Sequence, residues 1–353
     1  MHSTIYTHSL KLRHPFGISR GTVSELPTVL LAMRSSEAPD APILGIGEGS
    51  PVRYKGQKAE DAVTLLEKMV ALVTPDNVGQ VEALSDKARA EIAPSHSAAL
   101  CAFDLALWDA RGRRERRPLF DLFGTDRPTN AQTSYTIGLS DHDTMEQRAR
   151  EAAHLPLIKV KLGRGIEFDL EAMRRIRAAA PNSLLRVDAN AGWTLDDART
   201  MCPKLADMGV DLVEQPLAIG NIEGMKALRG QWPVFIVADE DAQDVASLDA
   251  LRGAVDGINI KLMKCGGLTE ALRMIRFARN EGWKILVGCM IETRLGLGAA
   301  AHLGGLVDYL DLDAYMLTTN DPFPPGSSAV LTADAPLPDH RPGIGYDWPL
   351  ELS

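Results

Sequence analysis

The chain has 353 residues, of which 45% are hydrophobic, enough for buried cores in about two domains. Its formal net charge of −9 disfavours nucleic acid or an anionic membrane as partner, because both need concentrated Lys and Arg. It lacks a signal-like leader, any apolar stretch of about 18 residues and closely spaced cysteines, so we expect a cytoplasmic protein with free thiols.

The first 127 residues are predicted to form strands followed by helices. Residues 3–13, 27–34 and 43–49 have strand-like patterns, and the glycines of the third segment would allow tight turns. Residues 58–74 carry apolar side chains at helical spacing, as does a segment that begins near Ser97 and ends in the basic run 111–117. This order indicates an α+β domain over residues 1–127.

From residue 128 onward, short apolar runs alternate with amphipathic segments such as 168–180 and 195–208, the second capped by Thr194. The residues that end the apolar runs, 22 to 28 apart from the second onward, are Thr136, Lys161, Asp188, Glu214, Asp239, Lys261, Cys289 and Asp313. This is the period of a β/α barrel, which we place at residues 128–320. The Pro- and Gly-rich residues 321–353 are interpreted as a return across the first domain.

The strand ends of a β/α barrel meet at one mouth, where catalytic residues lie. Asp188, Glu214 and Asp239 end three consecutive strands, and without countercharge they would repel one another unless a cation bound. Oxygen ligands of this kind suit a hard octahedral ion such as Mg²⁺. The sequence therefore predicts a metal site.

Lysines flank the three carboxylates. Lys159 and Lys161 share one face of the second barrel strand, where a like charge or a metal would lower a lysine's pKa toward that of a usable base. Lys261 lies in register on the sixth strand, opposite the second, whereas Lys264 falls in a Gly-rich turn. Lys161 and Lys261 can thus serve the two faces of one planar carbon, as in a racemase or epimerase, and a divalent cation would stabilise the enediolate.

The eighth barrel strand carries a pair of carboxylates. Asp311 and Asp313 share a face across the mouth from Glu214. They could hold a cationic group at the far end of a substrate whose carboxylate is at the metal. The alternative is that they are solvated or cap a turn.

Seven short motifs carry a family resemblance: KVK at 159–161, DAN at 188–190, EQP at 214–216, ADE at 238–240, NIKLMKCGG at 259–267, GCMIETRLG at 288–296 and DLD at 311–313. With them the chain resembles the enolase superfamily, muconate-lactonizing subgroup, and within it the dipeptide epimerases that interconvert L-Ala-D-Glu and L-Ala-L-Glu. The resemblance implies a modified TIM barrel, (β/α)7β, with an α+β capping domain.

The resemblance also implies roles for individual residues. Mg²⁺ would lie on Asp188, Glu214 and Asp239, supported by Asn190 and Glu240. Lys161 and Lys261 would be the acid and base, and the DLD motif would bind the α-ammonium of the dipeptide. Residues 14–24 would form a loop over the substrate, with Arg20 either paired with a glutamate carboxylate or solvated. The remaining substrate-binding candidates are Lys159, Thr136 and Met290, of which Thr136 could equally pack inside the barrel.

Other functions remain open at this point. N-acylamino acid racemases, o-succinylbenzoate synthases and cycloisomerases of the same subgroup are compatible with two lysines and a metal, and so is a barrel that only binds ligands. Acid-sugar dehydratases are disfavoured, because they commonly carry a histidine base after the seventh strand, where this chain has Cys289 and Met290. His302 comes later and is interpreted as structural. The sequence leaves open the two substrate residues and whether the chain forms a homo-oligomer.

Overall fold

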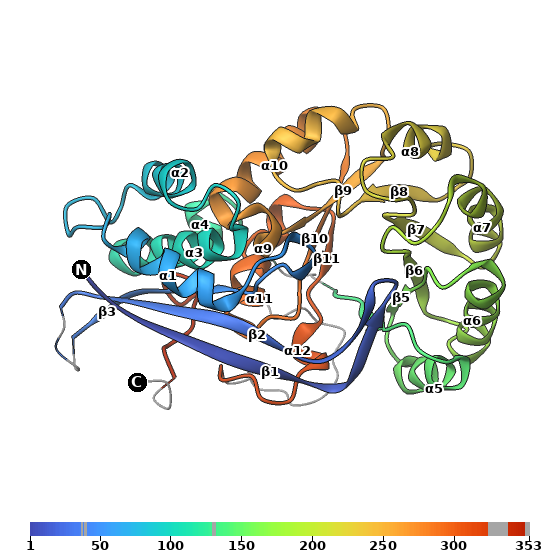
Figure 1. Ribbon diagram of the computed structural model, residues 1–353, viewed down its shortest axis with the longest axis horizontal. Coiled ribbons are helices and arrows are strands. Elements are labelled where there is room, and N and C mark those ends of the chain that lie inside the picture. The colour runs from blue at the N-terminus through green and yellow to red at the C-terminus, as the bar shows by residue number, and fades with distance from the viewer. Residues whose placement is uncertain (37, 39–40, 129–131, 324–337, 350–353) are drawn as a thin grey trace.

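The computed structural model describes residues 1–36, 38, 41–128, 132–323 and 338–349. A three-stranded antiparallel sheet with helices against it lies beside an eight-stranded parallel sheet that curls into a nearly closed barrel (Figure 1). The predicted enolase-like fold, an α+β capping domain with a modified TIM barrel, is confirmed. Across these residues, no helix is both long and apolar enough to cross a membrane.

The sheet of the capping domain is built on one long hairpin. Strands β1 (His2–Ile18) and β2 (Gly21–Arg34) pair along almost their whole length, and β3 (Ile43–Gly49) adds to β2. The prediction of a loop over residues 14–24 is therefore wrong, because β1 continues to Ile18 and β2 begins at Gly21. The segment is the tip of the hairpin, which reaches toward the barrel near β5 (Figure 1).

The helices of the capping domain are α1 (Ala59–Val70), α2 (Val81–Glu91), α3 (Ser97–Glu115) and α4 (Leu119–Leu122), with a short 3₁₀ turn, η1 (Arg53–Lys55), ahead of them. The α3 helix is almost entirely buried between β3 and the barrel. It ends at the basic run, as predicted, with Arg116 in a left-handed conformation at φ 56°.

The glycines of β3 serve close packing, and the tight turns predicted for them are absent. A Cβ atom at Gly45, Gly47 or Gly49 would lie 2.0 to 2.1 Å from a backbone carbonyl oxygen of α3. The three alternate along the strand, so one face of β3 is bare backbone on which the helix rests.

The barrel strands follow one another in chain order: β4 (Tyr135–Ile137), β5 (Leu157–Lys161), β6 (Leu184–Asp188), β7 (Val210–Glu214), β8 (Phe235–Ala238), β9 (Gly257–Lys261), β10 (Lys284–Gly288) and β11 (Tyr309–Asp311). The connecting helices are α5 (His142–Ala152), α6 (Ile166–Ala179), α7 (Leu195–Asp207), α8 (Ile222–Leu228), α9 (Leu262–Cys265), α10 (Leu268–Asn280), α11 (Arg294–Ala301) and α12 (Ala314–Leu317), with 3₁₀ turns η2 (Val245–Leu251) and η3 (Gly304–Leu306). Thr194 caps α7 in a capping box, as predicted.

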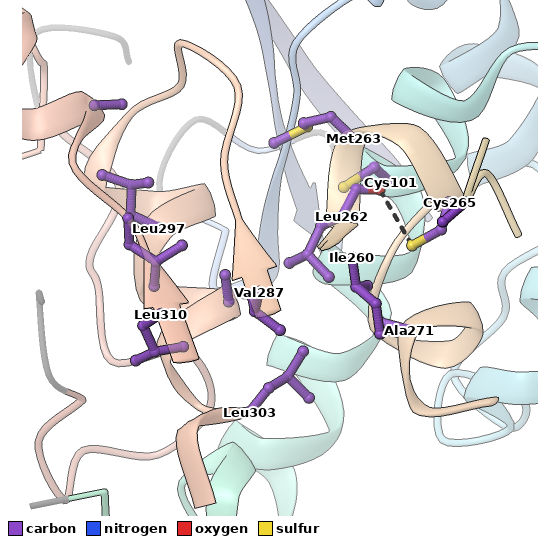
Figure 2. Packing of buried hydrophobic residues seen from close by; sticks show 14 of the residues in the cluster. Cys101, Ile260, Leu262, Met263, Cys265, Ala271, Val287, Leu297, Leu303 and Leu310 are labelled. Atoms are coloured by element: carbon purple, nitrogen blue, oxygen red, sulfur yellow. Dashed lines mark hydrogen bonds between the residues drawn. The ribbon is translucent and has the colours of Figure 1, made fainter. Parts of the chain in front are cut away.

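Apolar side chains fill the space around the strands. Ile260, Val287 and Leu310 belong to the last three strands, and Figure 2 shows them packed with residues of α9 to α11 and with Cys101 of α3. Cys265 Sγ donates to the carbonyl of Leu262 at 3.7 Å, and all four cysteines are free thiols, as expected. The capping domain and the barrel thus share a continuous core.

Side chains join the first and last barrel strands. The backbone N–H of Thr136 donates to Asp313 Oδ2 at 2.7 Å, and that of Leu312 donates to Thr133 Oγ1 at 2.7 Å. The carboxylate of Asp313 is thereby fixed at the seam.

The chain passes back to α3 after the barrel. Within residues 338–349, the N–H of Ile344 donates to Asp109 Oδ1 of α3 at 2.8 Å. The predicted return over 321–353 also includes residues 324–337 and 350–353, which lie outside the described part of the chain. The limits at 127 and 320 stay predictions.

Candidate active site

Three carboxylates converge at the C-terminal ends of adjacent strands. Asp188 and Glu214 are the last residues of β6 and β7, and Asp239 directly follows β8. Each offers an oxygen within 4.8 Å of the others, and all three are buried. Lys161, Asp188 and Glu214 are neighbours in the register of β5, β6 and β7. Lys261 and Asp311 both have Gly288 of β10 as their neighbour in the register.

Lysine side chains neutralise part of the charge of these three carboxylates. The expectation that the carboxylates lack countercharge is therefore wrong. Lys161 Nζ lies 2.6 Å from Asp188 Oδ2, and Lys261 Nζ lies 2.8 Å from Asp239 Oδ2. The two lysines come from β5 and β9, four strands apart in the eight-stranded order. They therefore approach the same cluster from opposite walls, as expected.

Lys159 links the carboxylate cluster to β11. Its Nζ lies 2.7 Å from Glu214 Oε2 and 2.8 Å from Asp311 Oδ2. Asp311 also accepts a hydrogen bond from Ser134 Oγ. The predicted pair of ammonium groups on one face is thus stabilised by carboxylates from three other strands.

Lys264, which the sequence pattern places in a Gly-rich turn, is buried beside Asp239. It lies in the short helix α9, and its ammonium donates to the Asp239 carboxylate and to the carbonyl oxygens of Asn259 at 3.1 Å and Ala242 at 3.3 Å. A Gly-rich turn was expected at this point. The glycines begin only after the helix, so Lys264 can turn inward and hold Asp239 in place.

Two amides orient the carboxylates further. Asn259 Nδ2 donates to Glu214 Oε1 at 2.8 Å, and Gln215 Oε1 accepts from the backbone N–H of Asp239 at 3.0 Å. Gln215 has a positive φ of 37°, and its Nε2 donates to Asp241 Oδ2 at 2.7 Å. Neither residue was assigned a role from the sequence, although both stand in the quoted motifs.

The ionisation of the cluster follows from burial and mutual charge. Burial alone would raise the pKa of Asp188, but Lys161 and Lys159 outweigh it and hold the pKa below its usual value. Burial raises the pKa of Glu214 to about 8, and neighbouring Asp188 adds to this. Burial would lower the pKa of Lys261, yet Asp239 and Glu214 raise it above its usual value. The lowered pKa was expected for the lysines of β5. It is wrong for Lys159 in this structure, because Asp311, Glu214 and Asp188 outweigh burial and hold the pKa of Lys159 above its usual value.

Asp313 differs from its neighbour Asp311. Asp313 lies just beyond β11, where the backbone of Thr136 donates to one oxygen and Cys289 Sγ approaches the other at 3.9 Å. Burial, with Asp311 close by, raises the pKa of Asp313 to about 6. Both carboxylates line the mouth, but Asp311 does not lie across it from Glu214 as expected, because the ammonium of Lys159 bridges the two.

A cavity of about 150 Å³ opens above these groups. The predicted residues that line it are Arg20, Thr136, Lys159, Lys161, Asn190, Asp239, Glu240, Lys261, Met290, Asp311 and Asp313. Asp188 and Glu214 have no exposed surface. The structure thus brings all the predicted site residues together around or beneath one cavity, while their individual roles stay predictions.

The chain matches two family models that together span most of its length. Residues 1–124 match the N-terminal domain of mandelate racemase/muconate lactonizing enzyme, and residues 143–352 match the enolase C-terminal domain-like model. The chain belongs to the mandelate racemase/muconate lactonizing enzyme family. The resemblance to the enolase superfamily predicted from the motifs is confirmed.

Several similar proteins are dipeptide epimerases. The hydrophobic dipeptide epimerase of Flavobacteria bacterium (strain MS024-2A) is 34% identical over 98% of this chain and 97% of its own. The L-Ala-D/L-Glu epimerase of Escherichia coli (strain K12) is 34% identical over 88% and 92%. The dipeptide epimerase of Enterococcus faecalis V583, solved with Mg and L-Leu-L-Tyr, superposes with a TM-score of 0.90 at 31% identity over 98% and 99%. The chain is therefore an isomerase of the dipeptide epimerase group.

The capping domain closes over the cavity in this family member. Ser19 Oγ and Arg20 Nη1, at the hairpin tip, donate to the carbonyl oxygen of Asn190 at 2.8 and 3.0 Å. A second contact joins the Leu139 N–H to the Gly17 carbonyl at 2.8 Å. Asn190, whose carbonyl oxygen accepts both bonds, has a positive φ of 45°. The predicted cover is thus present as a docked hairpin.

Proposed function

We propose that the chain is a Mg²⁺-dependent dipeptide epimerase that moves a proton at the α-carbon of the C-terminal residue of a dipeptide. The observation that carries this proposal is the pair of opposed lysines, Lys161 on Asp188 and Lys261 on Asp239, at one buried cluster. A planar intermediate between them would present one face to each ammonium. A 1,1-proton transfer needs this arrangement.

The cluster fits a divalent cation by its donor chemistry. Asp188, Glu214 and Asp239 offer hard oxygen ligands within 4.8 Å of one another, and no thiolate or imidazole is among them. Bound there, Mg²⁺ would stabilise the negative charge that develops on a substrate carboxylate. Asn259 and Lys264 would hold two of these ligands in position.

The protein's own residues supply the remaining steps. Asp239 and Glu214 raise the pKa of Lys261 when no cation is bound, and a divalent charge on these carboxylates would oppose that effect. The lysine facing the α-hydrogen would then accept it as a neutral amine, and the opposite lysine would donate a proton to the other face, with the roles exchanged for the other epimer. Asp311 and Asp313 would receive the α-ammonium, because they are the two carboxylates of β11 and its end that line the cavity. We retain Lys159 as a substrate-binding residue, since it lies between the cluster and Asp311.

An α-ammonium separates this function from the alternatives in the same family. N-acylamino acid racemases, o-succinylbenzoate synthases and cycloisomerases act on substrates without that group. Their substrates would bind no worse when Asp311 and Asp313 are replaced by Asn, whereas a dipeptide should lose most of its affinity. The relatives include epimerases for hydrophobic dipeptides and for L-Ala-D/L-Glu, the substrate expected from the sequence.

Proton exchange in heavy water tests the proposal. The chain is incubated with Mg²⁺ in D₂O and a panel of L,L-dipeptides, and the α-hydrogen of the C-terminal residue is followed by ¹H NMR. Deuterium incorporation together with the L,D epimer is expected. Absence of both across the panel would refute the function.

The proposal retains the cytoplasmic location expected from the sequence, with which the four free thiols agree.

A further inference from the structure

Apolar side chains wall the part of the cavity that faces the capping domain. They are Phe16, Ile18, Val23 and Leu26 of the hairpin, with Met290 and Ile291 from the segment after β10. The same six side chains line an adjoining cavity of about 360 Å³. A ligand group that enters this space exchanges water for apolar contact, which favours an apolar group.

The side chain of the C-terminal substrate residue has to occupy this space if the proposed function is right. Its α-carbon would lie between Lys161 and Lys261, with its carboxylate toward the three buried acids and its amide toward Asp311. The remaining substituent points away from the packed barrel interior. The hairpin is the element on that side.

Arg20 is the cation expected to bind a glutamate side chain, but it is already engaged. Its Nη2 lies 2.6 Å from Glu240 Oε1, its Nη1 donates to the Asn190 carbonyl, and its guanidinium stacks 5.2 Å from the ring centroid of Tyr54. The Glu240 side chain is 2% exposed. Withdrawing Arg20 toward a substrate would leave a buried carboxylate without its cation.

The other arginine of this region is placed farther out. Arg53, in η1, lines the wider cavity but not the inner one above the lysines. It is exposed to solvent. Among the described residues, every Lys and Arg side chain that lines the inner cavity already has a carboxylate partner. An acidic substrate side chain would therefore find no unpaired cation there.

We propose, on the basis of the dipeptide epimerase function, that the chain selects dipeptides with a hydrophobic C-terminal side chain over those ending in Glu. Arg20 is a positioning residue that holds Glu240 and fixes the hairpin tip on Asn190. Specificity then resides in the apolar wall, to which Val23 and Met290 belong.

A competition between two matched substrates tests the inference. kcat/KM for α-deuterium exchange is measured with L-Ala-L-Leu and L-Ala-L-Glu, and the Leu dipeptide should be favoured by about tenfold or more. Arg20→Met should lower both values together and leave their ratio unchanged, with partial recovery of both in Arg20→Lys. Met290→Gln, similar in volume but polar, should lower the Leu value more than the Glu value. The matched control is Arg252→Met, an exposed arginine paired with Asp249 in η2, which should change neither.

Two results would overturn the inference while leaving the epimerase function intact. One is equal or faster exchange with L-Ala-L-Glu. The other is a fall in the Glu value alone in Arg20→Met, which would show that this guanidinium binds the substrate. Failure of every dipeptide to exchange would instead refute the proposed function, and the inference with it.

Discussion

Each of the two opposed lysines should handle one epimer. Replacing Lys261 by Gln should reduce epimerisation by about 10² to 10⁴-fold, because one face of the carbon loses its proton donor. Lys161 would still exchange the α-hydrogen of the epimer whose α-hydrogen faces Lys161. Deuterium should therefore enter either the L,L or the L,D dipeptide, but not both. Lys161→Gln should show the opposite preference in the same NMR assay.

The control for this pair is Lys284→Gln. Lys284 begins β10, far from the mouth, and its side chain is 42% exposed. Unchanged rates are expected there. Exchange of both epimers by either active-site variant would show that a single lysine serves both faces.

Asn259 should affect metal affinity without being a ligand. Its hydrogen bond to Glu214 Oε1 orients that carboxylate, so Asn259→Ala should weaken Mg²⁺ binding by about 10 to 100-fold in isothermal titration calorimetry. Asn280→Ala, at the exposed end of α10, serves as the control and should bind as the wild type does. Equal affinity in the two variants would mean that the amide plays no part in the metal site.

The charged residues of the site could be predicted from the sequence because they end strands at a regular period. Asn259, Gln215 and Lys264 could not, because their roles depend on which neighbour each side chain meets after folding. The error over countercharge has the same origin. Lys159 and Asp311 are 152 residues apart, and the spacing of strand ends does not reveal that their side chains touch.

At the scale of elements, the contact between β3 and α3 depends on bare backbone. A side chain at Gly47 would collide with the carbonyl of Ala102, so Gly47→Val should lower the free energy of unfolding by about 1 to 3 kcal/mol or more. Urea denaturation followed by circular dichroism measures the change. Thr7→Val, at an exposed position of β1, is the matched control and should be close to neutral. Similar midpoints for both variants would show that α3 moves aside freely.

Alternation of apolar and polar residues located the strands and helices well, but it could not show what the glycines do. A glycine in a strand is compatible with a turn or with close approach of another element. The deciding partner, α3, lies some fifty residues farther along the chain. The expected loop over residues 14–24 is a similar case, since the strands pair up to Ile18 and Gly21 and the contact of Ser19 with Asn190 joins residues that are far apart in the sequence.

At the scale of the whole molecule, His302 ties three parts of the chain together. It follows α11 of the barrel, its Nδ1 accepts from the N–H of Phe120 in α4 at 3.1 Å, and its Nε2 lies 3.2 Å from the carbonyl oxygen of Ile344 in the returning segment. The ring must be neutral to accept at Nδ1 and donate at Nε2. Burial lowers the pKa of His302 from 6.5 to about 4.

This lowered pKa should make the joint between domain and barrel sensitive to acid. As the pH falls through 6.5, the unfolded chain protonates its histidine while the folded chain does not, so the stability present above pH 6.5 is progressively lost down to about pH 4. The loss between pH 7 and 5 should be about 2 kcal/mol. Glutamine at position 302 keeps one acceptor and one donor but does not titrate. Between pH 7 and 5, the unfolding free energy of His302→Gln measured in urea should therefore fall by about 2 kcal/mol less than that of the wild type. Because other buried groups titrate identically in both proteins, equal losses in wild type and variant would show that the imidazole is protonated in the folded state.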